Sequence, residues 1–282
     1  ALGQPVAGEF SPDFAEFLRR RYPRFDFRGS EKGINAGFGG KLSSSEVVRR
    51  IPIVFVHGNS DRAIGGPMGG WSDSVKGFLA AGYQPGELYG LTWGHARKKM
   101  ALFQYHSYKN LNHVRNFIEA VMAYTGAEKV NVICHSMGVT LARKAIKGGW
   151  ARGMIWRRYS LGEPLTKRIN VFIGIAGANQ GLASAFGAFF FPTTGLTNGL
   201  HPKSRFLAEL NSHEGFEGDH VYSIWSHRDQ LVSHKAKAPY FPEQTCRIPG
   251  ETGTFELPDL GHLELKSDTV SKQLELILKH EP

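Results

Sequence analysis

The chain has 282 residues, of which 41% are hydrophobic and 21% are charged, and its formal net charge is +9. A chain of this length can bury a large core, and these proportions exclude an intrinsically disordered protein. The longest apolar runs are far shorter than the roughly 20 residues of a membrane-spanning helix, so we expect no transmembrane segment. The basic residues form short scattered clusters without a zinc-finger spacing or an RNA-binding signature, so we expect no nucleic-acid partner.

The two cysteines, Cys134 and Cys246, are too few for a disulfide-rich scaffold or a cysteine zinc site. We expect no metal ion and no organic cofactor, because no group of carboxylates has the spacing of a metal site. The sequence begins at Ala1, which fits a secreted protein after removal of its signal, although a shortened chain would look the same. We therefore expect an extracellular protein and leave its oligomeric state open.

The first half of the chain alternates between predicted helices and strands. Ser11 and Pro12 are typical of a helix start, and Pro23 ends this first helix. The glycine-rich stretch 29–44 indicates a surface loop. The run IPIVFVH at 51–57 is continuously apolar, as in a strand buried on both faces of a parallel sheet. The next predicted elements are a helix at 71–81, a strand at 86–93 and a helix at 107–124.

The second half continues this alternation. The predicted elements are a strand at 125–134, a helix at 137–147, strands at 167–179 and 219–225, and a final helix at 267–279. Strands that alternate with helices imply right-handed crossovers and a mainly parallel sheet covered by helices on both sides. We therefore predict one α/β domain over residues 1–282, with an irregular insertion at about 178–216.

The stretch VNVICHSMGV at 130–139 places Ser136 where an apolar strand stops and a helix begins. A nucleophilic serine on such a sharp turn has small residues two positions away on each side, as in G-x-S-x-G. Gly138 fits this pattern, whereas Cys134 replaces the first glycine, and His135 is expected to pack away from the pocket. The setting favours a nucleophile at a helix N-terminus, where the helix dipole stabilises negative charge. The alternative is a serine that only caps the helix.

A serine nucleophile needs a base that takes its proton. In this fold the partners follow in the order Ser, Asp or Glu, His. Asp229 comes just after the strand at 219–225, and His262 lies in a loop before the last helix. We predict that His262 is the base and then the acid, and that Asp229 orients its ring. Asp219 lies at the wrong end of its strand, and Asp259 is too close to His262 in the sequence.

An oxyanion hole requires two preorganised N–H donors. The N–H of Met137 is predicted to be one of them, because this residue directly follows the serine. The other donor is expected from the loop HGNSD after the first strand, where we predict Asn59, with Ser60 as the alternative. Gly58 allows a close approach of the backbone, and His57 is predicted to hold this loop by hydrogen bonding.

The stretches PIVFVHGNSD, YTGAEKVNVICHSMGVTLARKAIKGG, IAGANQGL and VYSIWSHRDQLV are long and specific. Together they resemble the class 2 lipase family, an α/β-hydrolase group, over roughly residues 10–280. The resemblance implies the α/β-hydrolase fold and the hydrolysis of carboxylic esters. It also implies that Ser136, Asp229 and His262 match the family's triad. HGNSD, YHS, AYTG and HSMGV are similar as well to extracellular depolymerases of amorphous poly(3-hydroxybutyrate).

The insertion contains the phenylalanine-rich stretch SAFGAFFFPTTGLTNG at 184–199. Phe189 and Phe190 in this stretch are predicted to belong to a mobile lid or an acyl-binding wall. Packing of the same stretch on the core is an equally good interpretation.

Four further residues are candidates for contact with substrate. Trp150 and Trp156 follow the helix after the nucleophile and either form an opposite wall or simply pack. Tyr105 and His106 follow the strand at 86–93 and are predicted to border the cleft.

The sequence thus predicts a serine hydrolase that cleaves carboxylic esters of lipophilic substrates through an acyl-enzyme on Ser136. We expect it to act at a lipid or polymer interface. A polyester (polyhydroxyalkanoate) depolymerase with the same triad is the nearest alternative. A non-catalytic binding protein of the same fold and an enzyme that transfers the acyl group to an alcohol are the others.

Overall fold

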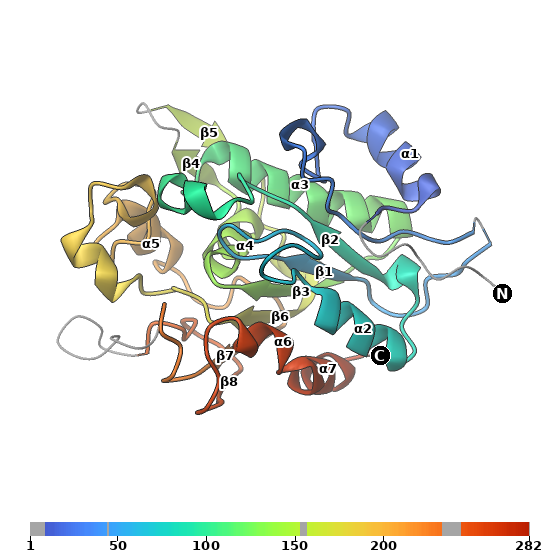
Figure 1. Cartoon of the computed structure of the whole chain (residues 1–282). Coiled ribbons are helices and arrows are strands. Elements are labelled where there is room, and N and C mark those ends of the chain that lie inside the picture. The colour runs from blue at the N-terminus through green and yellow to red at the C-terminus, as the bar shows by residue number, and fades with distance from the viewer. Residues whose placement is uncertain (1–8, 44, 153–156, 233–243, 282) are drawn as a thin grey trace.

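The computed structural model of the chain describes residues 9–43, 45–152, 157–232 and 244–281. Its centre is a six-stranded parallel sheet with the strand order β2-β1-β3-β6-β7-β8 (Figure 1). The strand bounds are Ile53–Val56 (β1), Leu88–Leu91 (β2), Val130–His135 (β3), Ile169–Ile175 (β6), His220–Trp225 (β7) and Gly253–Glu256 (β8). A separate antiparallel hairpin joins β4 (Trp150–Arg152) and β5 (Arg158–Ser160).

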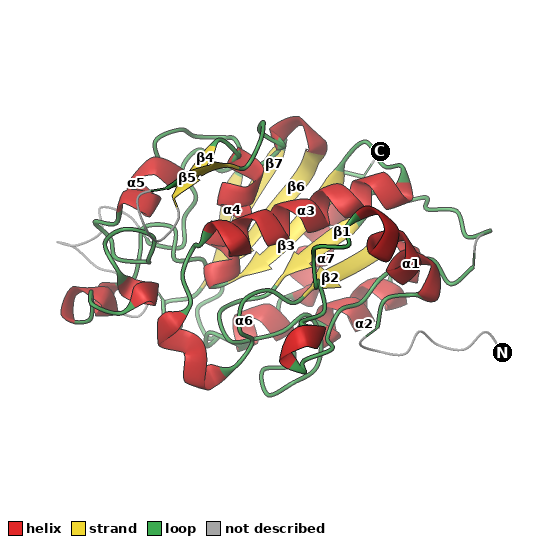
Figure 2. Ribbon diagram, turned by 90° about the horizontal axis from the view of Figure 1, so that it is seen from above, coloured by secondary structure: helices red, strands yellow, loops and turns green. Residues whose placement is uncertain are grey.

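Helices cover both faces of the sheet (Figure 2). One face carries α3 (Tyr108–Thr125) and α4 (Met137–Lys147), with α1 (Pro12–Arg21) packed on α3. The other face carries α2 (Ser72–Ala80) and α7 (Val270–Leu278), which pack on each other, and α6 (Glu264–Ser267) contacts α2. The short helix α5 (Arg205–Leu210) packs on α4. The α/β-hydrolase architecture expected from the sequence is therefore present.

Strand β1 illustrates why the sheet is buried on both sides. Successive side chains of a strand point to opposite faces. Val54 and Val56 accordingly join the core under α3 and α4, whereas Ile53 and Phe55 join the core under α2 and α7. All four are fully buried, which explains the continuous apolar run in the sequence.

Most of the predicted elements are confirmed, with three differences. The strand β8 and the hairpin β4–β5 were not predicted. The predicted final helix at 267–279 is α7 alone, and the shorter α6 precedes it as a separate helix. The first helix begins as predicted, because the hydroxyl of Ser11 accepts a hydrogen bond from the N–H of Phe14 and Pro12 is the first helical residue.

The parallel sheet brings the carboxyl ends of its strands to one edge, where ligands bind in open α/β folds. Ser136 follows β3 at this edge, and the loops after β1, β7 and β8 end there as well. The insertion at 178–216 contains η5 (Ala183–Gly187), η6 (Pro192–Thr194) and α5. Its role as a lid and the single domain over 1–282 stay predictions. No helix among the described residues is long and apolar enough to cross a membrane.

Candidate active site

Ser136 sits on a strained turn between β3 and α4. Its φ of 55° lies in the left-handed region, which non-glycine residues rarely adopt. The turn is tight because α4 starts against the loop after β1: a methyl group on Gly138 would lie 2.3 Å from the carbonyl oxygen of His57. Only glycine fits at this position, as the sequence pattern predicted. Cys134, in place of the pattern's first glycine, is a fully buried free thiol in the core.

The structure brings Ser136, His262 and Asp229 into one hydrogen-bonded chain. The Ser136 hydroxyl oxygen lies 2.9 Å from Nε2 of His262, and Nδ1 of the same ring lies 2.8 Å from a carboxylate oxygen of Asp229. The carboxylate only accepts hydrogen bonds, so Nδ1 carries the proton and Nε2 is free to accept the hydroxyl proton. Asp229 is fully buried and His262 is nearly so, whereas Ser136 is partly exposed.

The second carboxylate oxygen of Asp229 is fixed by the backbone. It accepts hydrogen bonds from the N–H groups of Leu231 at 2.8 Å and Val232 at 3.0 Å. The backbone N–H of His262 donates to the side-chain oxygen of Gln230 at 3.3 Å. The loop after β7 thus holds both the carboxylate and the backbone of the histidine. These contacts fix the carboxylate in one orientation, in which its other oxygen faces the His262 ring.

Two sources of N–H groups meet beside the serine. Met137 is the first residue of α4, so its N–H has no acceptor within the helix. The loop after β1 approaches from the other side: a methyl group on Gly58 would lie 2.9 Å from Cβ of Ser136. Asn59 follows Gly58 in this loop, and its side-chain amide donates to the carbonyl of Ala101 at 2.9 Å. This hydrogen bond holds the loop in place, with its backbone beside Ser136.

His57 anchors the same loop, as predicted. Its Nε2 accepts a hydrogen bond from the N–H of Trp93 at 3.0 Å, so its Nδ1 carries the proton and donates to the carbonyl of Gly58 at 2.7 Å. The indole N–H of Trp93 donates in turn to the carbonyl of His57 at 2.8 Å. The loop after β1 is thus tied to the segment after β2 by two hydrogen bonds between His57 and Trp93.

His135 contacts His262, although the sequence predicted that it packs away from the pocket. Its Nε2 lies 2.9 Å from the backbone carbonyl oxygen of His262, so this nitrogen carries the proton and donates it. The two rings are 4.6 Å apart. His135 is buried beside Ser136 and holds the His262 loop by this hydrogen bond, rather than only packing.

A buried ion pair joins the two sides of the site. The ammonium group of Lys266 lies 2.6 Å from a carboxylate oxygen of Asp61, and both side chains are no more than 4% exposed. Lys266 also donates to the carbonyl of Met68 at 2.8 Å. Asp61 belongs to the loop that carries Asn59, and Lys266 follows His262 by four residues. The pair therefore fixes the loop after β1 against α6, next to His262.

Burial keeps three histidines neutral near the site. It lowers the pKa of His57 and of His106 to about 4, mainly by desolvation. The pKa of His135 also lies well below its ordinary value, first because of burial and then because of the nearby His262. These three residues, the buried histidines, act as neutral hydrogen-bonding groups at neutral pH.

The candidate substrate residues occupy different environments. His106 is fully buried rather than at the cleft border: its Nδ1 donates to the carbonyl of Asn198 at 3.0 Å, and its Nε2 lies 2.8 Å from the Thr140 hydroxyl. It therefore links the insertion to α4, because both ring nitrogens are used in the interior. Tyr105 beside it is partly exposed.

The aromatic residues of the predicted walls are exposed where the structure describes them. Trp150, at the start of the hairpin, is 62% exposed. Phe189 is 53% exposed and Phe190 is 69% exposed, whereas Ala185, Thr193 and Thr194 of the same stretch are buried. The stretch thus packs in part and exposes these two rings, and both interpretations stay predictions. Trp156 lies outside the described residues.

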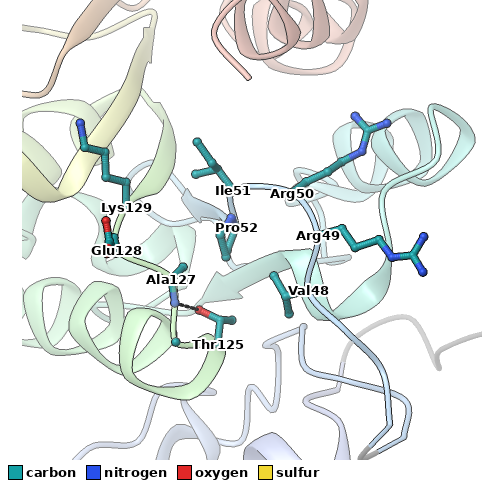
Figure 3. Close-up of a pocket in the computed structure, with 10 residues that line it drawn as sticks. Val48, Arg49, Arg50, Ile51, Pro52, Thr125, Ala127, Glu128 and Lys129 are labelled. Atoms are coloured by element: carbon teal, nitrogen blue, oxygen red, sulfur yellow. Dashed lines mark hydrogen bonds between the residues drawn. The ribbon is translucent and has the colours of Figure 1, made fainter. Parts of the chain in front are cut away.

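A pocket of about 380 Å³ lies at the opposite edge of the sheet (Figure 3). It is lined by residues 48–52 before β1 and 125–129 before β3. Two of its three cations are engaged in ion pairs, because Arg50 pairs with Glu281 at 3.1 Å and Lys129 pairs with Asp219. Asp219 lies at this amino edge, as predicted, so it is remote from the serine. In the described part of the chain, no group of three or more histidine, cysteine, aspartate or glutamate residues could hold a metal ion.

The model of the lipase (class 2) family matches residues 50–275. The chain belongs to the class 2 lipase family. No curated protein matches it. Membership in this family supports a lipolytic hydrolase function and a lipophilic substrate.

Solved structures agree with this family at the level of the fold. Lipase B of Aspergillus fumigatus has a TM-score of 0.56 at 15% identity, covering 84% of this chain and only 56% of that one. A structure from a study of LipS and LipT, two metagenome-derived lipolytic enzymes, has a TM-score of 0.53 at 15% identity, with coverages of 83% and 96%. Mature Bacillus licheniformis lipase BlEst2 has a TM-score of 0.52 at 14% identity, covering 86% of this chain and 97% of that one. Together they show that this class 2 lipase family member has the α/β-hydrolase fold.

Proposed function

We propose that the protein hydrolyses carboxylic esters of lipophilic substrates through an acyl-enzyme on Ser136. The observation that carries this proposal is the hydrogen-bonded chain from the Ser136 hydroxyl through His262 to Asp229, with distances of 2.9 and 2.8 Å. A serine that only capped the helix would not require a histidine and an aspartate aligned in this way. The serine side chain also makes no capping hydrogen bond to α4.

In the first half of the reaction, the Ser136 oxygen attacks the ester carbonyl carbon while Nε2 of His262 takes the hydroxyl proton. The carbonyl oxygen becomes an oxyanion beside the N–H groups of Met137 and Asn59, which stabilise it. When the tetrahedral intermediate collapses, the bond to the alcohol oxygen breaks and His262 returns its proton to the departing alcohol. The acyl group is left on the serine.

The second half repeats these steps with water. His262 takes a proton from the water molecule as its oxygen attacks the acyl carbon, and the same oxyanion site holds the new negative charge. Collapse releases the carboxylic acid and restores the Ser136 hydroxyl with the proton from His262. Asp229 stays ionised throughout and stabilises the imidazolium that forms twice.

Exposed apolar side chains near Asp229 and His262 support a lipophilic substrate. Leu231 lies two residues after Asp229 and is 61% exposed, and Leu263 follows His262 and is 39% exposed. Together with Phe189 and Phe190 they offer apolar surface to an acyl chain or to a polyester. We rank acylglycerols and simple lipophilic esters first and a polyhydroxyalkanoate second. The proposal includes secretion, which activity in the culture fluid of the producing cells would test.

The test uses a panel of p-nitrophenyl esters, an emulsified triglyceride and an amorphous hydroxyalkanoate polyester, together with fluorophosphonate labelling. We expect ester hydrolysis and labelling of the wild-type chain, and loss of both in Ser136→Ala. The Asp229→Asn variant is expected to lose about 10⁴-fold in kcat, because the histidine tautomer is no longer fixed. A folded wild-type chain that neither reacts nor hydrolyses would be a binding protein. Ester products formed with methanol would indicate acyl transfer, and activity on the polyester without activity on triglyceride would reverse the ranking.

A further inference from the structure

Large apolar side chains are exposed on the edge of the molecule that carries Ser136. A soluble protein rarely exposes a group of such residues unless the surface has a partner. Two of them belong to η3 (Lys98–Phe103), where Leu102 is 47% exposed and Phe103 is 51% exposed. The others at this edge are Phe189, Phe190, Leu231 and Leu263.

The helix η3 also carries positive charge. Lys98 and Lys99 are exposed, and neither forms an ion pair with any residue that the structure describes. A 3₁₀-helix has three residues per turn, so Lys99 lies on the same side as Leu102. Ammonium groups and apolar side chains therefore occur together on one short exposed element.

A single carbonyl group connects η3 to both the site and the insertion. The carbonyl of Ala101 accepts a hydrogen bond from the side-chain amide of Asn59 at 2.9 Å and from the hydroxyl of Thr193 at 2.6 Å. Thr193 lies in η6, just after Phe189 and Phe190. The exposed side chains of η3 and of the insertion are therefore neighbours beside the oxyanion loop. Figure 1 shows the insertion, in gold, at the end of the molecule opposite α1.

The charge around this edge is uneven. The guanidinium of Arg97 donates to the carbonyl of Lys32, and the ammonium group of Lys32 donates to the carbonyl of Gly94, so these two cations lie together beside η3. Burial, and then the charges of Lys32, Lys109 and Arg97, lower the pKa of His95. On the His262 side of the site, by contrast, the exposed Asp259 pairs with Arg228 at 3.7 Å, so the positive charge there has a partner. Among the described residues, the positive charge beside η3 is thus unpaired at Lys98 and Lys99, whereas that of Arg228 near His262 is paired.

We propose that residues 97–103, together with Phe189 and Phe190, form a basic–aromatic rim that docks the protein on an anionic lipid surface. Apolar side chains of such a rim enter the acyl boundary, while lysines remain at the headgroups. The lysines favour a charged lipid surface over an uncharged polyester, on which their charge would gain nothing. Docking would bring the partly exposed Ser136 to the lipid. The use of this rim rests on the proposed lipolytic function, but the docking itself needs no chemistry.

The test measures sedimentation of the Ser136→Ala chain with vesicles of phosphatidylcholine, alone or mixed with phosphatidylglycerol. We expect the anionic vesicles to bind more tightly, with an advantage that salt removes. Lys98→Gln/Lys99→Gln should weaken this binding roughly 25-fold, about fivefold for each lysine. Leu102→Ser/Phe103→Ser should weaken it at least about tenfold.

Matched control variants carry the same kinds of substitution at positions away from the rim. Lys76→Gln/Lys167→Gln removes two exposed lysines elsewhere, and Leu42→Ser/Val47→Ser removes two exposed apolar side chains. These controls should bind like the parent. Equal binding to neutral vesicles, equal loss in the controls, or unchanged binding of both rim variants would overturn the proposal.

Hydrolysis of soluble p-nitrophenyl butyrate is measured in parallel on chains that retain Ser136. We expect both rim variants to keep wild-type rates, because their substituted side chains do not touch the reacting groups. If the vesicles bind as expected but the wild-type chain hydrolyses no ester, the proposed function is wrong and the docking proposal is supported. If the chain cleaves esters but shows no preference for anionic vesicles, only the docking proposal is wrong.

Discussion

Replacing Lys266 with methionine is expected to lower the free energy of unfolding by about 3–5 kcal/mol, because it leaves the Asp61 carboxylate buried without its cation. The two charges are 2.6 Å apart, and their side chains are 4% and 3% exposed, so water cannot take the place of the ammonium group. One Asp61 oxygen would keep its hydrogen bond from the N–H of Arg62, but the other would lose its partner. Urea unfolding at neutral pH measures the difference.

The double variant Asp61→Asn/Lys266→Met removes both charges and keeps similar volumes. Because buried ion pairs are often replaceable by neutral groups, we expect it to be at least about 1 kcal/mol more stable than Lys266→Met. Lys272→Met is the matched control, since Lys272 pairs with the 59% exposed Glu275 and such a surface pair contributes about 0–1 kcal/mol.

Activity provides the second measurement on the same variants. The pair fixes the loop of Asn59 against the helix after His262, so its loss should shift the oxyanion donors relative to the base. A displacement of about 1 Å can cost 10²-fold in rate. For a short soluble ester we expect kcat to fall roughly 10- to 100-fold, with a much smaller change in KM. A Lys266→Met protein that loses under about 1 kcal/mol, or a double variant no more stable than the single one, would refute this reasoning.

Three further predictions concern the same site. Gly138→Ala is expected to lower the free energy of unfolding by at least about 3 kcal/mol and to abolish ester hydrolysis, because its methyl group would lie 2.3 Å from a backbone carbonyl oxygen. Urea unfolding measures the loss. In the control Gly187→Ala the methyl group meets nothing within 4 Å, so its stability should stay within about 0.5 kcal/mol of wild type. His135→Phe removes a donor to the His262 carbonyl, so kcat for a soluble ester should fall roughly tenfold with KM unchanged; an unaltered kcat would contradict this role. The buried histidines have lower pKa values in the folded protein than the ordinary 6.5, so the unfolded chain binds more protons as the pH falls. Stability should therefore decrease between about pH 6.5 and 4, by roughly 1.4 kcal/mol per pH unit for each histidine, and constant urea midpoints from pH 7 to 5 would refute it.

The sheet and the convergence of Ser136, Asp229 and His262 could be predicted because local signals mark them. A strand buried on both faces is mainly apolar, as β1 is and as β3 is apart from Asn131 and His135. The chain order of the fold then assigns the carboxyl-edge loops. Strand β8 has no such signal. Its four residues alternate between half-buried and exposed, and it begins with Gly253, so neither an apolar run nor strong strand propensity marks it.

The supporting contacts could not be predicted because their partners are distant in the sequence. Asp61 and Lys266 are 205 positions apart, and only the packing of α6 beside the β1 loop brings them together. The same holds for His106, which follows a strand but turns inward. Its partners Thr140 and Asn198 come from α4 and the insertion, and the sequence near residue 106 says nothing of either.

The departure of Cys134 from the G-x-S-x-G pattern has a structural reason. Close approach at this turn is required on the helix side, where Gly138 faces a backbone carbonyl that cannot move aside. On the strand side the side chain points into the core and has space, because the neighbouring strand places Gly174 opposite Cys134. A methyl group on Gly174 would lie 2.9 Å from Cγ1 of Val139, so this glycine also lets α4 pack closely. The tight turn at Ser136 thus depends on a glycine of β6 that lies outside the pattern, while the first position of the pattern accepts a buried thiol.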